Sequence, residues 1–279
     1  HQALRIAARA NYRQTCVNFR DGILQESWHL NNEFLRLCGV GLTGIAGRPD
    51  LSDYDYTLME RETTFAAFSM ADELGLQRPK NVTCVKPSGS LSKIMDTTEG
   101  IHKPLGKYIF NNVNFGRHDP MIPILADANY NIFDNPTDPT SVLVTFPVKW
   151  DSVEFDNWNG MEVNLDSAIK QLDKYKMVQN TWSHQNVSNT IRYSQDEVPQ
   201  IIDWMLDNWE SYIGVSFLYR ADPTKSAKDL GYQYLPQEVV TKEVYDEYVK
   251  HLKPVVLDKI AGFDEIEQDA CSTGACPIK

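Results

Sequence analysis

The stretch Asn81-Val82-Thr83-Cys84-Val85-Lys86-Pro87-Ser88-Gly89-Ser90-Leu91-Ser92-Lys93 decides the fold and carries the first candidate site. Its start, Asn81 to Val85, predicts a short buried strand, and the serine-rich end predicts a tight turn and the beginning of a helix. A helix start presents free N–H groups and partial positive charge, and both suit a phosphate group. Gly89 lets the backbone approach a ligand closely. The candidate phosphate-binding residues are therefore Lys86, Ser88, Gly89 and Ser90, with further donors at Ser92 and Lys93.

An ordinary strand-to-helix turn with serine caps explains the same stretch. The pattern is not the longer Walker sequence, whose glycines and lysine follow a fixed spacing. Taken by themselves, these residues favour the plain turn over the phosphate site.

Strand and helix patterns alternate through much of the chain. Strands are predicted at 141–148, 187–193 and 213–218, and helices at 56–74, 121–128, 165–176, 194–209 and 241–252. In the helix at 56–74, Leu58, Phe65, Phe68 and Leu74 are expected to face inward. Ser194 and Glu197 predict a capping box that opens the helix at 194–209. This alternation predicts an α/β fold, with a layer or barrel of parallel strands. The Pro- and Asp-rich stretch from Asn131 to Thr140 predicts an exposed loop.

A glycine-rich run lies earlier in the chain. Gly39-x-Gly41-x-x-Gly44 matches the bare spacing of a dinucleotide site. The strand before it is poor, and no acidic residue follows at the distance that such a site requires. The run therefore indicates close packing or the approach of a ligand, and not a nicotinamide site.

Glu99 and His102 form a second candidate pair, because they follow a short helix and could face a pocket. A single histidine in a loop is more often held by ordinary hydrogen bonds, and that interpretation is the default. We predict no metal site in the chain, since the cysteines are scattered and zinc requires four ligands at short spacing.

Composition limits the class of protein. The chain has 279 residues, 42% of them hydrophobic, and a net charge of −11. It is long enough for one large or two small domains. The acidic balance argues against general nucleic-acid binding. No membrane-length apolar run and no signal peptide are visible. Five mostly isolated cysteines suit a reducing cytoplasm. Because the chain begins at His1 within a helical pattern, we expect a fragment, a processed piece or a split subunit.

The C-terminal end, Cys271-Ser272-Thr273-Gly274-Ala275-Cys276-Pro277-Ile278-Lys279, contains two cysteines with four residues between them. The acidic segment before it has little to bury and is expected to be mobile. A mobile dithiol suits thiol–disulfide exchange between two partners. Half a zinc site and a static disulfide fit less well. The spacing leaves a redox pair and two accidental surface thiols equally open.

Several segments together resemble the adenosylcobalamin-dependent (class II) ribonucleoside-triphosphate reductases. They occur in the family's order and span nearly the whole chain: Val85 to Ser90, Thr98-Glu99-Gly100-Ile101-His102, Thr145-Phe146-Pro147-Val148-Lys149, Thr181-Trp182-Ser183-x-x-Asn186-x-Ser188, and the tail from Cys271 to Lys279. The tail also resembles that of the iron-dependent reductases. Those enzymes typically carry Pro-Thr-Ala-Ser where this chain has Pro-Ser-Gly-Ser, which favours the cobalamin type.

The resemblance implies the C-terminal half of a ten-stranded α/β barrel with an appended α/β region. Residues 1–150 would complete the barrel, 151–260 would form the appended region, and 261–279 would be a mobile redox tail. It also implies that the loop at Lys86, Ser88, Gly89 and Ser90 holds the substrate phosphates. Glu99 and His102 would contribute to the adenosylcobalamin pocket.

The implied activity is reduction of ribonucleoside triphosphates to deoxyribonucleotides. In this family, homolysis of the cobalt–carbon bond leads to a thiyl radical on a finger-loop cysteine. Two further barrel cysteines supply the electrons and form a disulfide. Cys271 and Cys276 would then reduce that disulfide, and thioredoxin would regenerate them.

The chain departs from the family in one important respect. The Asn-Pro-Cys-Gly-Glu type of finger loop is absent, and Cys16, Cys38 and Cys84 lack its context. The barrel redox cysteines have no match either. We therefore expect no turnover by this chain alone and an N-terminal half as its partner. The rival interpretations are the same part of an iron-dependent reductase and a non-catalytic phosphate-binding module.

Overall fold

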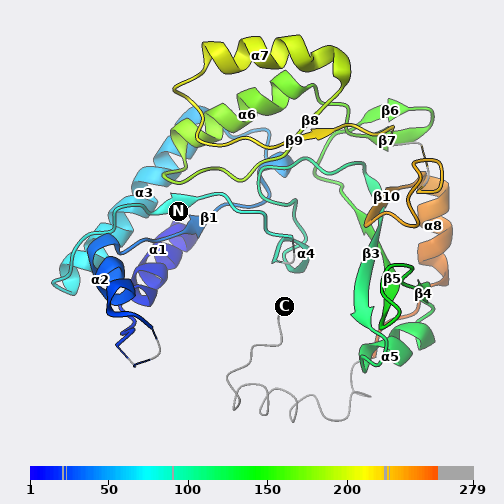
Figure 1. Ribbon diagram of the computed structural model, residues 1–279, viewed down its shortest axis with the longest axis horizontal. Helices are drawn as coiled ribbons and strands as arrows, with labels where there is room; N and C mark the ends of the chain where they lie inside the picture. Colours follow the sequence, from blue (N-terminus) through cyan, green and yellow to red (C-terminus); the bar gives the residue numbers. More distant parts are fainter. Residues whose placement is uncertain (21, 23, 90, 223–224, 226, 257–279) are drawn as a thin grey trace. The chain divides into compact units, whose positions relative to one another are not determined.

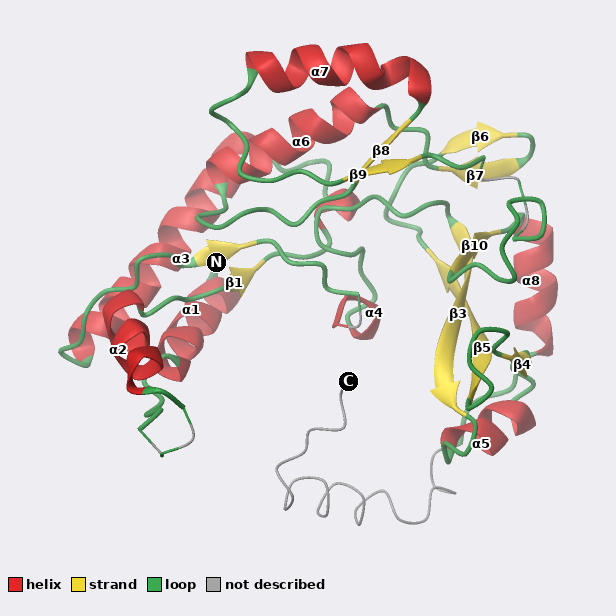
Figure 2. Cartoon of the chain, in the orientation of Figure 1, coloured by secondary structure: helices red, strands yellow, loops and turns green. Residues whose placement is uncertain are grey.

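Figures 1 and 2 show a computed structural model of the chain. It describes residues 1–256 with the exception of 21, 23, 90, 223–224 and 226. Ser90, Cys271 and Cys276, and with them the predicted tail region 261–279, lie outside the described residues. None of the helices in the described part is long and apolar enough to span a membrane.

Two compact units divide the chain. Unit 1 comprises His1–Pro104, Trp150–Phe155 and Asn164–Ala221; unit 2 comprises Leu105–Lys149, Asp156–Val163 and the described part of Asp222–Lys279. One boundary between the units falls between Lys149 and Trp150, next to the predicted boundary at residue 150, but the units are not the contiguous ranges 1–150 and 151–260. The difference has a physical cause, because a strand from late in the chain completes a sheet that begins near residue 108.

The first layer of unit 1 is helical. Helix α1 (Gln2–Gln14) packs against α3 (Asp53–Glu73), and α2 (Glu26–Leu35) lies between them in the chain. Helix α3 begins at a capping box formed by Ser52 and Asp55.

Helix α3 buries its small residues and not its large ones. The buried face carries Tyr56, Thr63, Ala66, Ala67, Met70 and Ala71. The expectation that Phe65 and Leu74 face inward is wrong, since they are 71% and 37% exposed. Small side chains on the contact face allow the two helix backbones to approach closely, and this leaves Phe65 on the outer face. Phe68 is partly buried against the same core.

Short parallel strands form the second layer of unit 1. Strand β1 (Val40–Gly41) pairs in parallel with β2 (Thr83–Cys84), and Val85 forms a parallel bridge with Val187. Strand β8 (Ile191–Tyr193) pairs in parallel with β9 (Phe217–Tyr219). This confirms the strands expected at 81–85 and 187–193, although each is shorter than expected.

Helices connect these parallel strands. Helix α3 lies between β1 and β2 in the chain, α6 (Ala168–Thr181) lies between β2 and β8, and α7 (Val198–Asp207) lies between β8 and β9. A one-turn helix α4 (Leu91–Ile94) follows β2, and 3-10 turns occur at Ile45–Gly47 and Gln195–Glu197. Ser194 and Glu197 form the predicted capping box. The parallel arrangement agrees with an α/β fold, and half of a ten-stranded barrel stays a prediction.

Unit 2 is built on a four-stranded antiparallel sheet. The strand order is β10 (Gln237–Val239), β3 (Tyr108–Gly116), β5 (Ser141–Lys149) and β4 (Ile132–Asp134). A separate hairpin joins β6 (Asp156–Trp158) to β7 (Met161–Val163). Helix α5 (Met121–Asp127) precedes β4, and α8 (Lys242–His251) follows β10.

Two expectations fail in unit 2. Parallel strands are wrong here, because β3 and β5 pair antiparallel from Tyr108–Lys149 to Gly116–Ser141. The exposed loop expected at 131–140 contains β4 and a buried Asn135, whose amide donates to Ser141 Oγ at 3.0 Å. The sequence did not indicate β3, since the three asparagines of Tyr108–Gly116 disfavour a strand. Pairing with the apolar β5 overrides that preference.

Helix α8 covers part of this sheet through aromatic contacts. The Tyr248 ring lies 4.9 Å from Phe110, and the Tyr245 ring lies 5.2 Å from Tyr108, measured between ring centroids. Thr241 caps the helix by accepting a hydrogen bond from the Val244 N–H. The predicted helix at 241–252 is therefore confirmed.

Candidate functional site

The loop after β2 has the predicted order of strand, turn and helix. The chain leaves β2 at Cys84 and enters α4 at Leu91. The Ser92 N–H donates to the Ser88 carbonyl at 2.9 Å, so helical hydrogen bonding begins at Ser88. Because α4 has a single turn, its dipole is short, and any anion would depend mainly on individual N–H groups of the loop.

Gly89 faces open space. A Cβ atom placed on Gly89 would have no neighbour within 4 Å, and its φ is outside the left-handed region. The fold itself therefore does not require glycine here. Lys86 and Gly89 are both exposed, so the loop presents a cationic side chain and bare backbone on the surface of unit 1. This is the geometry expected where a ligand approaches the backbone closely.

The Ser88 hydroxyl lies in a network of hydrogen bonds. Ser88 Oγ is 2.5 Å from Thr43 Oγ1, and Thr43 Oγ1 donates to the Thr98 carbonyl at 2.8 Å. The Gly100 N–H donates to Thr43 Oγ1 at 3.0 Å and reaches Ser88 Oγ at 3.3 Å. Three separate segments meet at these two hydroxyls. Thr43 comes from the glycine-rich run and was not among the predicted site residues.

Glu99 has a partner inside the protein. Its carboxylate lies 2.7 Å from Lys93 Nζ, and the same ammonium group lies 4.8 Å from the centre of the Trp150 ring. Both ends of the Lys93–Glu99 pair are partly exposed. The pair connects α4 to the turn that follows it, so the Lys93 ammonium group is engaged with Glu99 and not with the loop from Lys86 to Gly89.

His102 is held at both ends. The backbone N–H of His102 donates to the Glu99 carbonyl at 2.9 Å, and the backbone N–H of Thr190 donates to the ring atom His102 Nε2 at 3.0 Å. Nε2 therefore acts as an acceptor, which places the imidazole proton on Nδ1 in the neutral form. Burial is the largest influence on His102 and lowers its pKa. A backbone hydrogen bond and the charge of Glu99 oppose this shift, and the charge of Arg192 adds a smaller lowering effect. The geometry matches the default interpretation of a hydrogen-bonded histidine. A cofactor role for His102 and Glu99 stays a prediction.

The three described cysteines are free thiols. Cys16 is exposed, whereas Cys38, which precedes β1, and Cys84, which lies in β2, are buried. Burial raises the pKa of Cys38 to about 11 and also raises the pKa of Cys84. A buried thiol with a raised pKa is a poor nucleophile. Among the described residues, no group of three His, Cys, Asp or Glu side chains is arranged to hold a metal ion.

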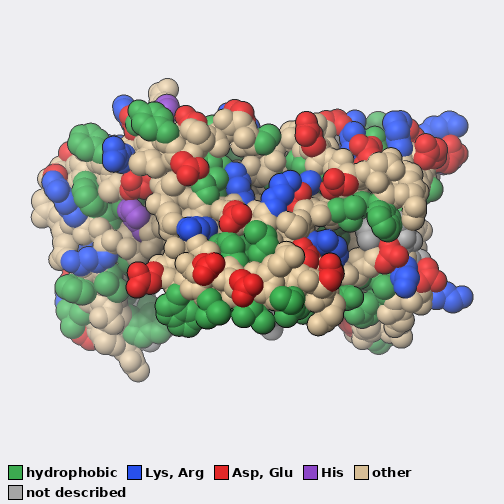
Figure 3. All heavy atoms as spheres, turned by 90° about the horizontal axis from the view of Figure 1, so that it is seen from above, with side chains coloured by type: hydrophobic (Ala, Val, Ile, Leu, Met, Phe, Trp, Pro, Cys, Tyr) green, Lys and Arg blue, Asp and Glu red, His purple; other side chains and the backbone are tan. Residues whose placement is uncertain are grey.

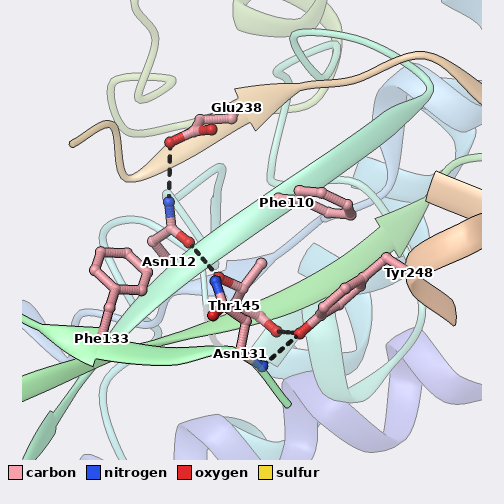
Figure 4. Close-up of a pocket in the computed structure, with 7 residues that line it drawn as sticks. All are labelled: Phe110, Asn112, Asn131, Phe133, Thr145, Glu238 and Tyr248. Carbon is pink, nitrogen blue, oxygen red and sulfur yellow. Dashed lines mark hydrogen bonds between the residues drawn. The ribbon is translucent and has the colours of Figure 1, made fainter. Parts of the chain in front are cut away.

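A cavity of about 480 Å³ lies on the sheet of unit 2 (Figure 4). Its lining consists of Phe110, Asn112, Asn131, Phe133, Thr145, Glu238 and Tyr248. The polar groups bond to one another: Thr145 Oγ1 donates to Asn112 Oδ1 at 2.8 Å, and Asn112 Nδ2 donates to Glu238 Oε1 at 3.3 Å. The Tyr248 hydroxyl donates to the Thr145 carbonyl at 2.8 Å.

These contacts hold α8 and β10 to the sheet, and they account for the polar lining of the cavity without a ligand. No sequence motif indicated this cavity, because its residues come from five elements: β3, β4 with the residue before it, β5, β10 and α8.

The surface carries mixed charge. On the face seen in Figure 3, acidic and basic side chains are interspersed, with apolar side chains among them. This face shows no continuous basic stripe of the kind that a general nucleic-acid binder presents.

The burial of His102 predicts a pH dependence of stability. The unfolded chain takes up a proton at His102 as the pH falls through about 6.5, whereas the folded chain resists protonation. Below about pH 6.5 the unfolded state therefore binds more protons than the folded state. Stability decreases as the pH is lowered, until the pH drops below the pKa that His102 has in the folded chain. We expect the melting temperature to drop less in the His102→Gln variant than in the wild type when the pH is lowered from about 7.5 to about 5.5.

The matched control is His118→Gln, because His118 is exposed. It should reproduce the wild-type loss. An unchanged loss in His102→Gln would show that His102 does not titrate as its burial implies.

The chain is similar to several curated proteins. It is 28% identical over 217 residues to the adenosylcobalamin-dependent ribonucleoside-triphosphate reductase of Lactobacillus gasseri, covering 75% of this chain and 28% of that protein. The same enzyme of Lactobacillus leichmannii is 29% identical over 218 residues, covering 74% and 28%. The chain thus spans about 28% of the length of these relatives. No protein-family model matches it.

A solved structure shares the fold. The crystal structure of a B12-dependent (class II) ribonucleotide reductase superimposes with a TM-score of 0.76 at 21% sequence identity, covering 96% of this chain and 39% of that one. The resemblance carried by the sequence motifs is thereby confirmed: this chain is similar in sequence to the adenosylcobalamin-dependent ribonucleoside-triphosphate reductases, and it has the fold of part of a class II ribonucleotide reductase.

Proposed function

We propose that this chain is the C-terminal part of an adenosylcobalamin-dependent ribonucleotide reductase that converts ribonucleoside triphosphates to deoxyribonucleotides. The observation that carries the proposal is the agreement of two comparisons. Reductases of this type match three quarters of the chain in sequence, and a class II reductase matches nearly all of it in fold. The order of the motifs along the chain supports the same proposal.

The phosphate loop supplies the clearest role for described residues. The Ser88 and Gly89 N–H groups and the Lys86 ammonium group would bind the substrate's phosphates, with Ser90 as a further predicted contact. Support comes from the exposed backbone at Gly89 and the open space beside it. Holding the phosphates fixes the ribose relative to the barrel, and positioning of this kind is a large part of catalysis.

Adenosylcobalamin is the proposed cofactor, and when bound it would supply the radical. Glu99 and His102 fit a place beside it and do not fit a bond to cobalt. His102 Nε2 already accepts the Thr190 N–H, and Glu99 pairs with Lys93. In this chain their role would be to shape the pocket wall, with His102 kept neutral by burial.

Electrons would reach the sugar through thiols. Each turnover removes the 2′-hydroxyl as water and oxidises two barrel thiols to a disulfide, so two electrons must be returned. Cys271 and Cys276 would return them by exchange, becoming a disulfide that thioredoxin reduces. The described cysteines do not suit this role, because Cys38 and Cys84 are buried and Cys16 is a single exposed thiol, whereas the exchange needs an accessible pair. The radical cysteine and the barrel thiols would come from an N-terminal half.

The cofactor requirement is tested by reconstitution. The purified 279-residue chain should form no deoxyribonucleotide with adenosylcobalamin and dithiothreitol. Addition of the N-terminal portion of a class II reductase should produce activity that depends on adenosylcobalamin and is independent of iron and oxygen.

Activity that requires iron would favour the iron-dependent type. Phosphate binding without activity in any combination would favour a non-catalytic module. Turnover by the chain alone would overturn the proposed division of roles.

The tail is tested in the same reconstituted enzyme. Changing Cys271 and Cys276 together to serine should abolish repeated turnover with thioredoxin and leave the first turnover intact, since the barrel thiols start reduced. Dithiothreitol should restore repeated turnover because it is small enough to enter the barrel. Cys16→Ser is the matched control, since Cys16 is the exposed thiol of the described part. Loss of the first turnover in the double variant would assign the pair to the chemistry at the sugar instead.

A further inference from the structure

Thr43 lies beneath the phosphate loop. We propose that Thr43 is a positioning residue that holds this loop through the Ser88 hydroxyl, so that a ligand's phosphate is bound by loop N–H groups and not by that hydroxyl. The phosphate part of this inference rests on the proposed function. The hydrogen-bond network stands on the structure itself.

The number of protons fixes the direction of the bonds. Thr43 has one hydroxyl proton, and it goes to the Thr98 carbonyl, which can only accept. The 2.5 Å contact between Thr43 Oγ1 and Ser88 Oγ therefore needs the Ser88 proton. The Gly100 N–H points at the same two oxygens as a donor. Ser88 Oγ is left with acceptor capacity only.

A phosphate oxygen is an acceptor and cannot use this hydroxyl as it stands. If the Ser88 proton turned toward a phosphate, no proton would lie between two oxygens 2.5 Å apart unless Thr43 released the Thr98 carbonyl. Either change breaks a hydrogen bond in a partly buried site, and a buried polar group left without a partner is costly. The hydroxyl is thus better suited to holding the loop than to binding a ligand.

The segments around Thr43 form a tightly fitted base. The Gly44 N–H donates to the Thr98 carbonyl at 2.9 Å, and the Ile45 N–H donates to the Gly100 carbonyl at 3.2 Å. A Cβ on Gly44 would lie 2.3 Å from Thr97 Oγ1, and one on Gly100 would lie 2.7 Å from the Lys86 carbonyl oxygen. Both glycines have positive φ values, +76° and +53°. The glycine-rich run is therefore needed for close packing beneath the loop.

The loop offers other donors for a phosphate. Pro87 has no N–H, and no described residue accepts a hydrogen bond from the N–H groups of Ser88 and Gly89. The packed segments around Thr43 fix the loop backbone on one side of the Ser88 and Gly89 N–H groups, through the close contact between Gly100 and the Lys86 carbonyl. Thr43 would then affect phosphate binding without touching the ligand.

The test uses the full 279-residue chain with inorganic triphosphate as the probe. Melting temperature without ligand and triphosphate affinity by calorimetry are measured for Thr43→Val, Ser88→Ala and the double variant. Thr43→Val keeps the shape and removes the hydroxyl, and Thr43→Ser restores a hydroxyl. Ser69→Ala is the matched control, because the Ser69 hydroxyl donates to the Phe65 carbonyl within α3 and takes no part in the Thr43–Ser88 network. Gly89→Val tests the open face of the loop.

We expect Thr43→Val and Ser88→Ala each to lower the melting temperature by about 2–4 °C, and the double variant to lose no more than the larger single loss. Both should weaken triphosphate binding by a similar factor, about 3- to 10-fold, again without addition in the double variant. Thr43→Ser should restore both properties, and Ser69→Ala should change neither. Gly89→Val should leave the melting temperature unchanged and weaken binding by about 10-fold or more.

Two results would overturn the inference. Weaker binding in Ser88→Ala with normal binding in Thr43→Val would mean that the Ser88 hydroxyl contacts the phosphate directly. Lower melting temperatures with unchanged affinity would make Thr43 a purely structural residue. If the wild-type chain binds no triphosphate, the proposed phosphate site fails, and the non-additivity of the melting temperatures alone then decides whether the network exists.

Discussion

The attachment of β2 to the end of α6 is the interaction on which the rest of unit 1 depends. Trp182 is fully buried, and its indole N–H donates to the Cys84 carbonyl at 2.9 Å. The Thr83 hydroxyl donates back to the Trp182 carbonyl at 2.5 Å. Two residues of β2 are thereby tied to two groups of one tryptophan. The Thr181-Trp182-Ser183 motif thus has a structural reason in this chain.

This attachment determines where the candidate loop from Lys86 to Gly89 begins. On one side β2 pairs with β1, and on the other Val85 bridges Val187, so the strand is held from both edges. His184 adds a further tie by accepting the Val82 N–H at 3.1 Å, while its Nε2 lies 2.9 Å from Glu60. A short strand of two residues would be weak by itself. The surrounding ties let it present Lys86 to Gly89 on a fixed base with an open face.

Sequence patterns predicted the parts of the structure that local signals control. Ser194 and Glu197 were recognisable as a capping box, and the apolar run at 141–148 was recognisable as a strand. Strand β3 was missed because Asn111, Asn112 and Asn114 disfavour a strand locally, and only pairing with β5 supplies the compensation. The prediction that Phe65 lies on the inward face of α3 was wrong, because the closely packed face of this helix buries alanines and leaves Phe65 exposed. The two units could not be predicted as contiguous ranges, since β10 joins β3 across more than a hundred residues of chain.

In the candidate site, too, the features set by neighbouring residues could be predicted, and the contacts between distant residues could not. The strand, turn and exposed Gly89 were readable from neighbouring residues. The pairing of Ser88 with Thr43, 45 residues away, was not, because no local pattern connects the two hydroxyls. The glycine spacing at Gly39, Gly41 and Gly44 was the one signal that could have pointed there. This spacing indicated close packing. In the structure, Gly44 packs closely against Thr97, and Gly100 packs closely against the Lys86 backbone.

We propose that the loop from Lys86 to Gly89 binds phosphate through its backbone N–H groups. This proposal can be tested by following the amide chemical shifts of the ¹⁵N-labelled chain during titration with inorganic triphosphate. We expect saturable shifts that are largest at the Ser88 and Gly89 amides, with the amides of unit 2 around Asn112 and Thr145 unaffected. Shifts that are absent from the loop, or that centre on the cavity of unit 2, would contradict it.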